Sequence, residues 1–273
     1  SKFKSKSYEE LSKKKCISYI KHHLAHASLG IYGSGYDSGM FVCMDDGGDE
    51  ADPFDTVWGT FEKNSIKILG RYNNGGWGIT RFHNFICESI GYLGNVDNGK
   101  VMGLAAYGQV KENLYKEFKK LLKISKDGFS AQFLLRHNPK KSKPRFDKLK
   151  LDAYEYYKVI NSSNPPKELK KITKHYSSLD IAATGQRVVE DVALEVVSNM
   201  LRHTKKKRLV CSGGFFQNIS FNKRLLDLNL GGVYVPSAPN DSGLSLGGAL
   251  FHKMSVSNTR PKKTLSSYLG PMF

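Results

Sequence analysis

Apolar and polar positions along the chain predict a mixed α/β protein. Apolar or alternating runs bounded by turn residues predict strands at residues 38–44, 56–63, 65–72, 128–135, 208–212 and 233–235. Helical spacing of apolar positions predicts helices at 22–32, 79–92, 111–123, 169–204, 217–228 and 241–252. The helix at 169–204 is expected to be interrupted near Tyr176. Strand, turn and helix alternate in the final third, an order in which ligands bind at the carboxyl ends of strands.

The stretch 137–166 breaks this pattern. It is basic, polar and bounded by prolines, which indicates an insertion or a mobile loop. The length of 273 residues allows one large domain or two modest ones. We expect one domain over 1–273 with the basic insertion inside it.

Composition adds a strong positive charge. The chain holds 42 Lys and Arg against 25 Asp and Glu, a formal net charge of +17, and much of the excess lies in short lysine runs. Solvated helix faces and loops account for such runs, and the absence of interleaved aromatic residues favours that interpretation. Attraction to the phosphates of a substrate or a nucleic acid is the alternative.

Other features of composition restrict the class of protein. The four cysteines lie far apart without a Cys-x-x-Cys pair, which predicts free, buried thiols in a reducing cytoplasm. No apolar stretch approaches the roughly 20 residues of a membrane span, and no signal peptide is visible. We therefore expect a cytoplasmic protein without a membrane partner.

The candidate chemistry begins with a histidine motif. His22 and His26 lie one helical turn apart, and His23 lies beside them. Asp45 follows a predicted strand and Asp241 begins a predicted helix, where an α/β fold gathers its ligands. Histidines and carboxylates together suit Fe²⁺, Mn²⁺ or Zn²⁺, and spacing does not choose among them. Helical histidine pairs also occur as caps, packing groups or surface residues.

Two small-residue segments follow. Gly213 and Gly214 join a predicted strand to a predicted helix, whose N-terminus suits an anion or a nucleotide, although such a pair is usually only a turn. The segment 236–249 is rich in glycine, alanine and serine, which allows tight helix packing or close approach of a ligand. Capping the helix is the alternative role for Asp241.

Taken together, these segments resemble the nodulation-protein and antibiotic O-carbamoyltransferases. The resemblance rests on the histidine motif at 22–27, Met44–Gly47, Lys100–Gly108, Ser212–Asn218, Asn240–Gly243 and Tyr268–Pro271. It implies the fold of actin, Hsp70 and the sugar kinases, a ribonuclease H-like mixed sheet with flanking helices. The blocks follow the family's order over nearly the whole chain.

The resemblance also implies a reaction and its residues. A carbamoyl group activated as carbamoyl adenylate, derived from carbamoyl phosphate and ATP, passes to a small-molecule hydroxyl acceptor beside a divalent metal. We favour Fe²⁺ as the ion, with Mn²⁺ or Zn²⁺ as alternatives. The implied metal ligands are His22, His26 and Asp241, and the implied catalytic residues are Asp45 and His23. The nucleotide is expected to contact Lys100, Gly213, Gly214, Asn218, Asn240 and Ser242.

The chain also departs from the family. Nothing matches the phosphate loop of the first strands, and nothing follows Tyr268–Pro271 where longer members carry the domain that forms carbamoyl adenylate. We therefore expect an incomplete first subdomain and a complementary N-terminal chain as partner. Two alternatives remain: a carbamoyl-type transferase that modifies a nucleic-acid base, or a non-catalytic nucleotide-binding fragment of this fold.

Overall fold

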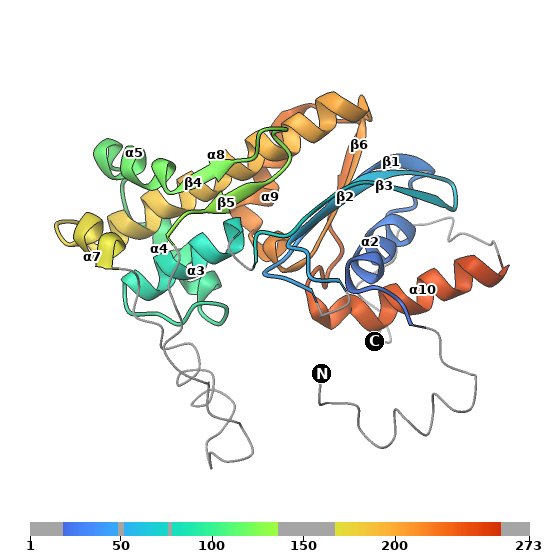
Figure 1. Cartoon of the computed structure of the whole chain (residues 1–273), viewed down its shortest axis with the longest axis horizontal. Coiled ribbons are helices and arrows are strands. Elements are labelled where there is room, and N and C mark those ends of the chain that lie inside the picture. The colour runs from blue at the N-terminus through green and yellow to red at the C-terminus, as the bar shows by residue number, and fades with distance from the viewer. Residues whose placement is uncertain (1–18, 49–51, 76–77, 136–166, 258–273) are drawn as a thin grey trace, which may run out of the picture. The chain divides into compact units, whose positions relative to one another are not determined.

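The computed structural model describes residues 19–48, 52–75, 78–135 and 167–257. The chain forms two compact units, drawn in Figure 1. The first unit comprises Ser1–Asn73, Lys207–Gly214 and Gly232–Phe273, and the second comprises Asn74–Lys206 and Phe215–Gly231. The predicted insertion at 137–166 lies outside the described residues, as do Cys16 and the 268–271 block. The expectation of one continuous domain stays a prediction.

A five-stranded mixed sheet forms the first unit, in the order β3-β2-β1-β6-β7. β1 pairs antiparallel with β2, and β2 antiparallel with β3, while β1 with β6 and β6 with β7 are parallel. The strands are β1 (Ser38–Met44), β2 (Thr56–Glu62), β3 (Ser65–Tyr72), β6 (Arg208–Ser212) and β7 (Gly232–Tyr234). The expected fold class, a mixed ribonuclease H-like sheet with flanking helices, is confirmed.

Two helices pack together in the first unit, α2 (His22–Gly33) and α10 (Leu244–Ser257). A Cβ at Gly247 would lie 2.1 Å from the carbonyl oxygen of Ala25, and one at Gly243 would lie 2.4 Å from Cδ2 of Leu29. These two glycines therefore let the neighbouring segments come into backbone contact. Of the two roles predicted for small residues here, the structure gives Gly243 and Gly247 tight packing.

Several predicted site residues lie directly after the ends of two neighbouring strands, β1 and β6. β1 ends at Met44, so Asp45 follows directly, and β6 beside it ends at Ser212. Gly213 then has φ +95°, and a Cβ there would lie 2.2 Å from the carbonyl oxygen of Met44. The backbone turn after β6 therefore requires glycine and brings Gly214 to the end of β1.

The second unit is mainly helical. Its long helix, α8 (Ser178–Thr204), buries a stripe of valines, and a hairpin of β4 (Leu122–Ile124) and β5 (Ala131–Phe133) lies against it. The break predicted near Tyr176 is confirmed. The other helices are α3 (Ile79–Ser89), α4 (Asn98–Ala105), α5 (Glu112–Lys120), α7 (Lys167–Thr173) and α9 (Ile219–Leu225).

Several predicted boundaries were wrong, and backbone geometry explains them. The strand predicted at 128–135 is confined to β5, because Gly128 has φ +82° in the preceding turn. The helix predicted at 79–92 ends at Ser89, two residues before Gly91 at φ +90°. The helix predicted at 111–123 ends at Lys120, because the next residues pair with β5 as β4.

Two predicted C-terminal helices are subdivided. The segment 217–228 consists of the end of a 3-10 turn at Gly214–Gln217, then α9, then a 3-10 turn at Leu226–Leu228. The segment 241–252 begins as a 3-10 turn, η4 (Asp241–Gly243), before α10. Cys43, Cys87 and Cys211 are free and buried, as predicted. Among the described residues, no helix is both long and apolar enough to cross a membrane.

Candidate metal centre

The first turns of α2 place two imidazoles on one face of the helix. The rings of His22 and His26 have their centroids 4.8 Å apart and meet edge to face. The side chain of His26 is fully buried, whereas that of His22 retains 12% exposure. The structure therefore confirms that the i, i+4 spacing brings the two imidazoles together.

Asp45 meets these imidazoles from the end of β1. Its Oδ2 lies 3.2 Å from Nε2 of His26 and 4.0 Å from Nε2 of His22. The same oxygen accepts a 3.0 Å hydrogen bond from the N–H of Gly214, and the backbone N–H of Asp45 donates to the carbonyl of Asp55. Both the backbone and the carboxylate of Asp45 are thus fixed.

Asp241 approaches from the other side, as the first residue of η4. Its Oδ1 lies 3.6 Å from Nε2 of His22 and 3.3 Å from Nε2 of His26. Its side chain is 70% exposed, in contrast to that of Asp45. Helix capping, the alternative role for Asp241, is not what the structure shows: Asn240 occupies the cap position, and no side-chain hydrogen bond caps this turn.

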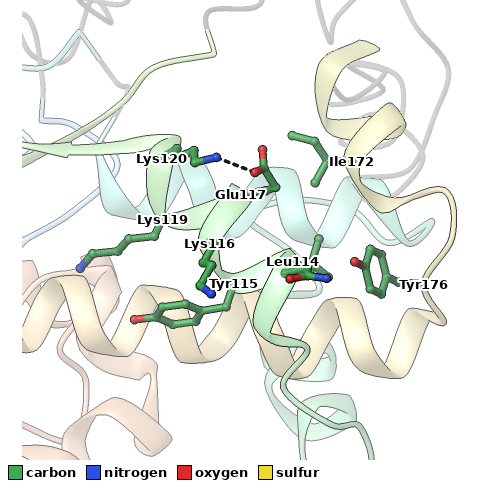
Figure 2. Close-up of a pocket in the computed structure, with 9 residues that line it drawn as sticks. Leu114, Tyr115, Lys116, Glu117, Lys119, Lys120, Ile172 and Tyr176 are labelled. Atoms are coloured by element: carbon green, nitrogen blue, oxygen red, sulfur yellow. Dashed lines mark hydrogen bonds and ion pairs between the residues drawn. The ribbon is translucent and has the colours of Figure 1, made fainter.

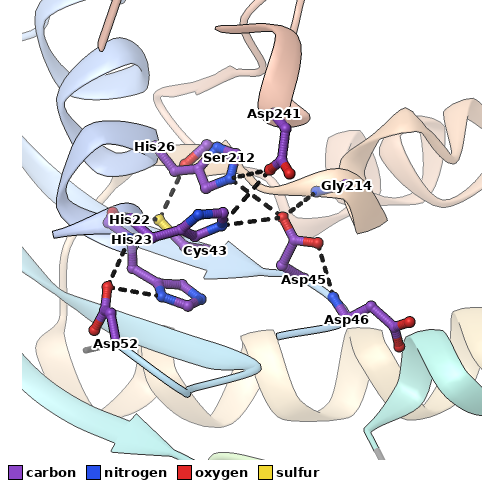
Figure 3. A network of polar contacts seen from close by, with 10 residues as sticks. All are labelled: His22, His23, His26, Cys43, Asp45, Asp46, Asp52, Ser212, Gly214 and Asp241. Carbon is purple, nitrogen blue, oxygen red and sulfur yellow. Dashed lines mark hydrogen bonds and ion pairs between the residues drawn. The ribbon is translucent and has the colours of Figure 1, made fainter. Parts of the chain in front are cut away.

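The four side chains converge on one point, as Figure 3 shows. One ligand atom from each of His22, His26, Asp45 and Asp241 lies within 4.8 Å of the others. Nitrogen and oxygen ligands bind such ions at about 2 Å, so two donors on one ion lie at most about 4 Å apart and small side-chain movements suffice.

The state of His26 supports a metal ion at this point. Within the described part of the chain, its buried Nε2 makes no hydrogen bond, although two carboxylate oxygens lie within 3.3 Å. A buried polar atom normally finds a partner, and a ligand is one explanation where none is found. The residues present therefore fit a divalent ion.

The electrostatics of Asp45 favour its ionised form. Burial alone would raise the pKa of this carboxyl group, but the imidazoles of His22 and His26 and the N–H of Gly214 outweigh burial. The net effect is a pKa well below the usual range. Asp45 is therefore an anionic carboxylate at neutral pH.

His23 faces a different partner, which the sequence did not predict. Its Nδ1 lies 3.0 Å from Oδ2 of Asp52, and both side chains are 2% exposed. Burial lowers the pKa of His23, although Asp52 opposes that change. Because a carboxylate only accepts, the neutral ring carries its proton on Nδ1 and leaves Nε2 bare. Asp52 is one of several acids between 45 and 55, and spacing alone does not distinguish it.

The predicted nucleotide residues divide between the two units. In the first unit, the N–H of Gly213 donates to the carbonyl of Pro239, and that of Gly214 donates to Asp45. Asn240 precedes η4, and Ser242 is exposed within it. These residues therefore border the histidine–carboxylate cluster along the chain.

Lys100 and Asn218 belong to the second unit. The ammonium of Lys100, on α4, lies 2.7 Å from Oδ1 of Asp97, the residue just before this helix, and the Lys100 side chain is largely exposed. Asn218 begins α9: its Oδ1 accepts the N–H of Phe221, and its amide exchanges hydrogen bonds with Gln186. Asn218 thus has a structural role, and its contact with a nucleotide stays a prediction, as does that of Lys100.

The second unit also contains a hollow away from the histidine–carboxylate cluster. A cavity of about 540 Å³ lies beside α5 and is lined by Leu114, Tyr115, Ile172 and Tyr176, with lysines at its edge. Figure 2 shows one of these lysines, Lys120, paired with a glutamate of the same helix. None of the predicted site residues lines this cavity.

Comparison with known proteins now places the chain. The family model described as "Carbamoyltransferase N-terminus" matches residues 4–250. The chain belongs to this family. It is 26% identical to nodulation protein NolNO of Sinorhizobium fredii over 261 residues, covering 93% of this chain and 34% of NolNO. It is 25% identical to nodulation protein NolO of Bradyrhizobium diazoefficiens over 258 residues, covering 92% of this chain and 42% of NolO.

Among solved structures, HypF of T. kodakarensis covers 95% of this chain with a TM-score of 0.48 and 14% identity, the chain spanning 40% of that protein. The carbamoyltransferase chain thus spans less than half the length of these relatives. Family membership confirms the resemblance, whereas the ligand roles of individual residues stay predictions.

Proposed function

We propose that this chain carries the metal-binding part of a carbamoyltransferase, which passes a carbamoyl group from carbamoyl adenylate to a hydroxyl acceptor. The convergence of two imidazoles and two carboxylates, within 4.8 Å of one another, carries the proposal. Family membership supports carbamoyl transfer as the reaction class. The adenylate and the hydroxyl acceptor follow from the family resemblance.

In this proposal His22, His26, Asp45 and Asp241 hold a divalent ion, with Fe²⁺ favoured over Mn²⁺ and Zn²⁺. When bound, such an ion polarises a carbonyl group and stabilises negative charge that develops on its oxygen. The exposed position of Asp241 leaves one side of the cluster open to a substrate. The buried imidazole of His26 closes the opposite side to solvent.

His23 is our proposed acceptor of the hydroxyl proton. Its bare Nε2 is buried and makes no hydrogen bond within the described residues. Its ring centroid lies 5.0 Å from that of the proposed ligand His22. A neutral imidazole with one bare nitrogen is a suitable general base near neutral pH. Asp45, ionised and shared with the imidazoles, is better suited to binding the ion than to moving a proton.

The double glycine contributes in a way that the sequence did not predict. The N–H groups of Gly213 and Gly214 are both bonded within the protein, to Pro239 and Asp45. A Cβ at Gly213 would meet the carbonyl oxygen of Met44, and one at Gly214 would meet the carboxylate of Asp45. We therefore propose that these glycines shape the turn that borders a nucleotide rather than bind its phosphates through their N–H groups. The phosphate charge then needs other donors, for which Lys100 is the proposed candidate.

A nucleic-acid acceptor finds less support. Three lysines of α5 each lie within 3.3 Å of a glutamate carboxylate: Lys116 with Glu112, Lys119 with Glu195, and Lys120 with Glu117. Their charges are thus partly compensated on the protein surface. The solvated-face explanation of the +17 charge covers these residues, so we retain a hydroxyl acceptor as the proposed substrate.

Metal binding by the 273-residue chain is the first test. Metal-free protein is titrated with Mn²⁺, and free Mn²⁺ is counted by electron paramagnetic resonance. We expect one ion per chain for the wild type and loss of that ion in the double variant His22→Ala/His26→Ala. A matched double variant, His175→Ala/His252→Ala, removes two exposed imidazoles and should keep the ion.

The variant Asp241→Asn tests whether misfolding, rather than the loss of a ligand, explains weaker Mn²⁺ binding. Its side chain is exposed, so the substitution should leave thermal unfolding unchanged while weakening Mn²⁺ binding. Equal Mn²⁺ content in all variants would remove the metal site from the proposal. The activity itself is tested with a hydroxyl acceptor, a complementary N-terminal chain, and carbamoyl phosphate and ATP together with a domain that forms carbamoyl adenylate. Transfer that is insensitive to His22→Ala/His26→Ala would contradict the mechanism.

A further inference from the structure

The N-terminus of α2 lacks a cap of its own. The first hydrogen bond within this helix runs from the N–H of Ala25 to the carbonyl of Lys21, so the three preceding N–H groups need partners outside the helix. Lys21 occupies the cap position, and no side chain there makes a capping hydrogen bond. The helix that carries the proposed metal ligands is therefore uncapped locally.

Asp52 supplies the cap from 29 residues away. Its Oδ2 accepts the backbone N–H of His23 at 2.8 Å. A carboxylate at this position also interacts favourably with the positive end of the helix dipole. Because Asp52 and His23 are both 1% exposed, solvent does not screen this interaction.

The same oxygen also fixes the side chain of His23. Oδ2 of Asp52 lies 3.0 Å from Nδ1 of the ring, as Figure 3 shows. One carboxylate oxygen thus binds the backbone and the side chain of a single residue. That residue stands directly after one proposed ligand, His22, and one turn before the other, His26, so restraint at His23 restrains both.

Gly48, which follows β1 and Asp45 in the chain, leaves room for the contact between Asp52 and His23. A Cβ at Gly48 would lie 2.0 Å from the carbonyl oxygen of Asp52 and 3.0 Å from Cε1 of His23. Glycine is therefore required at 48 if Asp52 is to reach the helix. The segment that begins with the ligand Asp45 also carries Asp52, which ties the helix ligands to the strand-end ligand.

We infer that Asp52 is a positioning residue for the metal centre: by binding the backbone and ring of His23 it holds His22 and His26 where Asp45 and Asp241 meet them. The inference rests on the proposed function, since it assumes an ion at the cluster. It predicts a metal affinity that depends on a carboxylate which does not itself belong to the four-ligand set.

The test compares Mn²⁺ affinity with the stability of the metal-free chain. Losing an outer partner of a metal site typically weakens binding by about 10- to 100-fold, and we expect a loss of this size for Asp52→Ala. Asp52→Asn keeps an oxygen that accepts both hydrogen bonds but removes the charge, so its affinity should fall between those of wild type and Asp52→Ala. Thermal unfolding in EDTA reports on folding separately.

Asp46→Asn is the matched control, because it removes a carboxylate from the same segment and retains the backbone N–H that binds Asp45. It should bind Mn²⁺ within about twofold of wild type. If Asp52→Ala does not fold, Asp52→Asn alone decides the question. Wild-type affinity in a folded Asp52 variant would overturn the inference while leaving the metal site intact. Absence of Mn²⁺ binding by the wild type would instead remove the metal site and the inference with it.

Discussion

Each unit of this chain buries a histidine among polar side chains, and the two surroundings differ in kind. In the first unit, His26 faces two carboxylates, Asp45 and Asp241, and its Nε2 makes no hydrogen bond to any residue that the structure describes. In the second unit, Nε2 of His83 likewise has no hydrogen bond among the described residues, but the ring lies among amides rather than carboxylates, with Nδ2 of Asn98 2.8 Å from its Nδ1. Burial alone therefore does not mark a site.

The amides of the second unit bind one another. Asn98 also donates to Oδ1 of Asn84, and Gln186 and Asn218 exchange hydrogen bonds in both directions. Amides carry both donors and acceptors, so they can form a neutral network without a ligand. Carboxylates only accept, so two of them beside the imidazoles of His22 and His26 form the kind of donor set that a cation would complete. This difference favours the proposed metal site in the first cluster and a structural role for the second.

The largest predicted effect concerns His83 and pH. Burial lowers the pKa of His83 to about 4, although Gln186 opposes the shift. The unfolded chain binds a proton at the ordinary pKa of about 6.5, so stability is fully present above that pH and is lost as pH falls toward 4. The loss at pH 4 is expected to be about 3 kcal/mol, from about 1.4 kcal/mol per pKa unit.

Urea unfolding between pH 7 and pH 4, in EDTA, measures this loss. His83→Gln keeps polarity without titrating, so its stability should fall less steeply than that of wild type over the same range. Parallel pH curves for the two proteins would show that His83 takes up a proton as readily in the folded chain as in the unfolded one, which would contradict a neutral His83 within the amide network.

A second, smaller effect is expected at Gln186, where a substitution should change stability without changing metal binding. The variant Gln186→Ala removes the oxygen that accepts a hydrogen bond from the buried amide of Asn218. This loss should lower the free energy of unfolding by about 1–3 kcal/mol. Mn²⁺ affinity should not change. Gln217→Ala, an exposed glutamine just before Asn218, is the control and should alter neither quantity by a measurable amount. Altered Mn²⁺ affinity in Gln186→Ala would break the distinction between the clusters.

The smallest effect on stability is expected at Lys100. Its ion pair with Asp97 is formed by a lysine that is 62% exposed, so Lys100→Ala should change the unfolding free energy by less than about 1 kcal/mol. If Lys100 neutralises phosphate as proposed, binding of an ATP analogue should nevertheless weaken. Unchanged nucleotide affinity would leave Lys100 with a surface role only.

The sequence alone determined the elements and much of the site. Apolar runs bounded by turn residues predicted β1 and β6 at the observed bounds. The i, i+4 spacing predicted that His22 and His26 lie on one face of α2. The order of the motifs identified the family. These features are local or linear, so a pattern along the chain contains them.

Only the tertiary structure decided the partners. Asp52 and His23 are 29 residues apart, and Gly214 and Asp45 are 169 apart. The second pair forms because the parallel pairing of β1 with β6 and the turn at Gly213 bring Gly214 to the end of β1. The first pair forms where the chain after β1 returns to the start of α2, next to Gly48. Asp46 and Asp52 carry the same side chain, and their sequence positions do not reveal that only Asp52 reaches the end of α2. The path of the backbone in three dimensions decides which of these acids contacts the helix, whereas the sequence shows only that both acids are present.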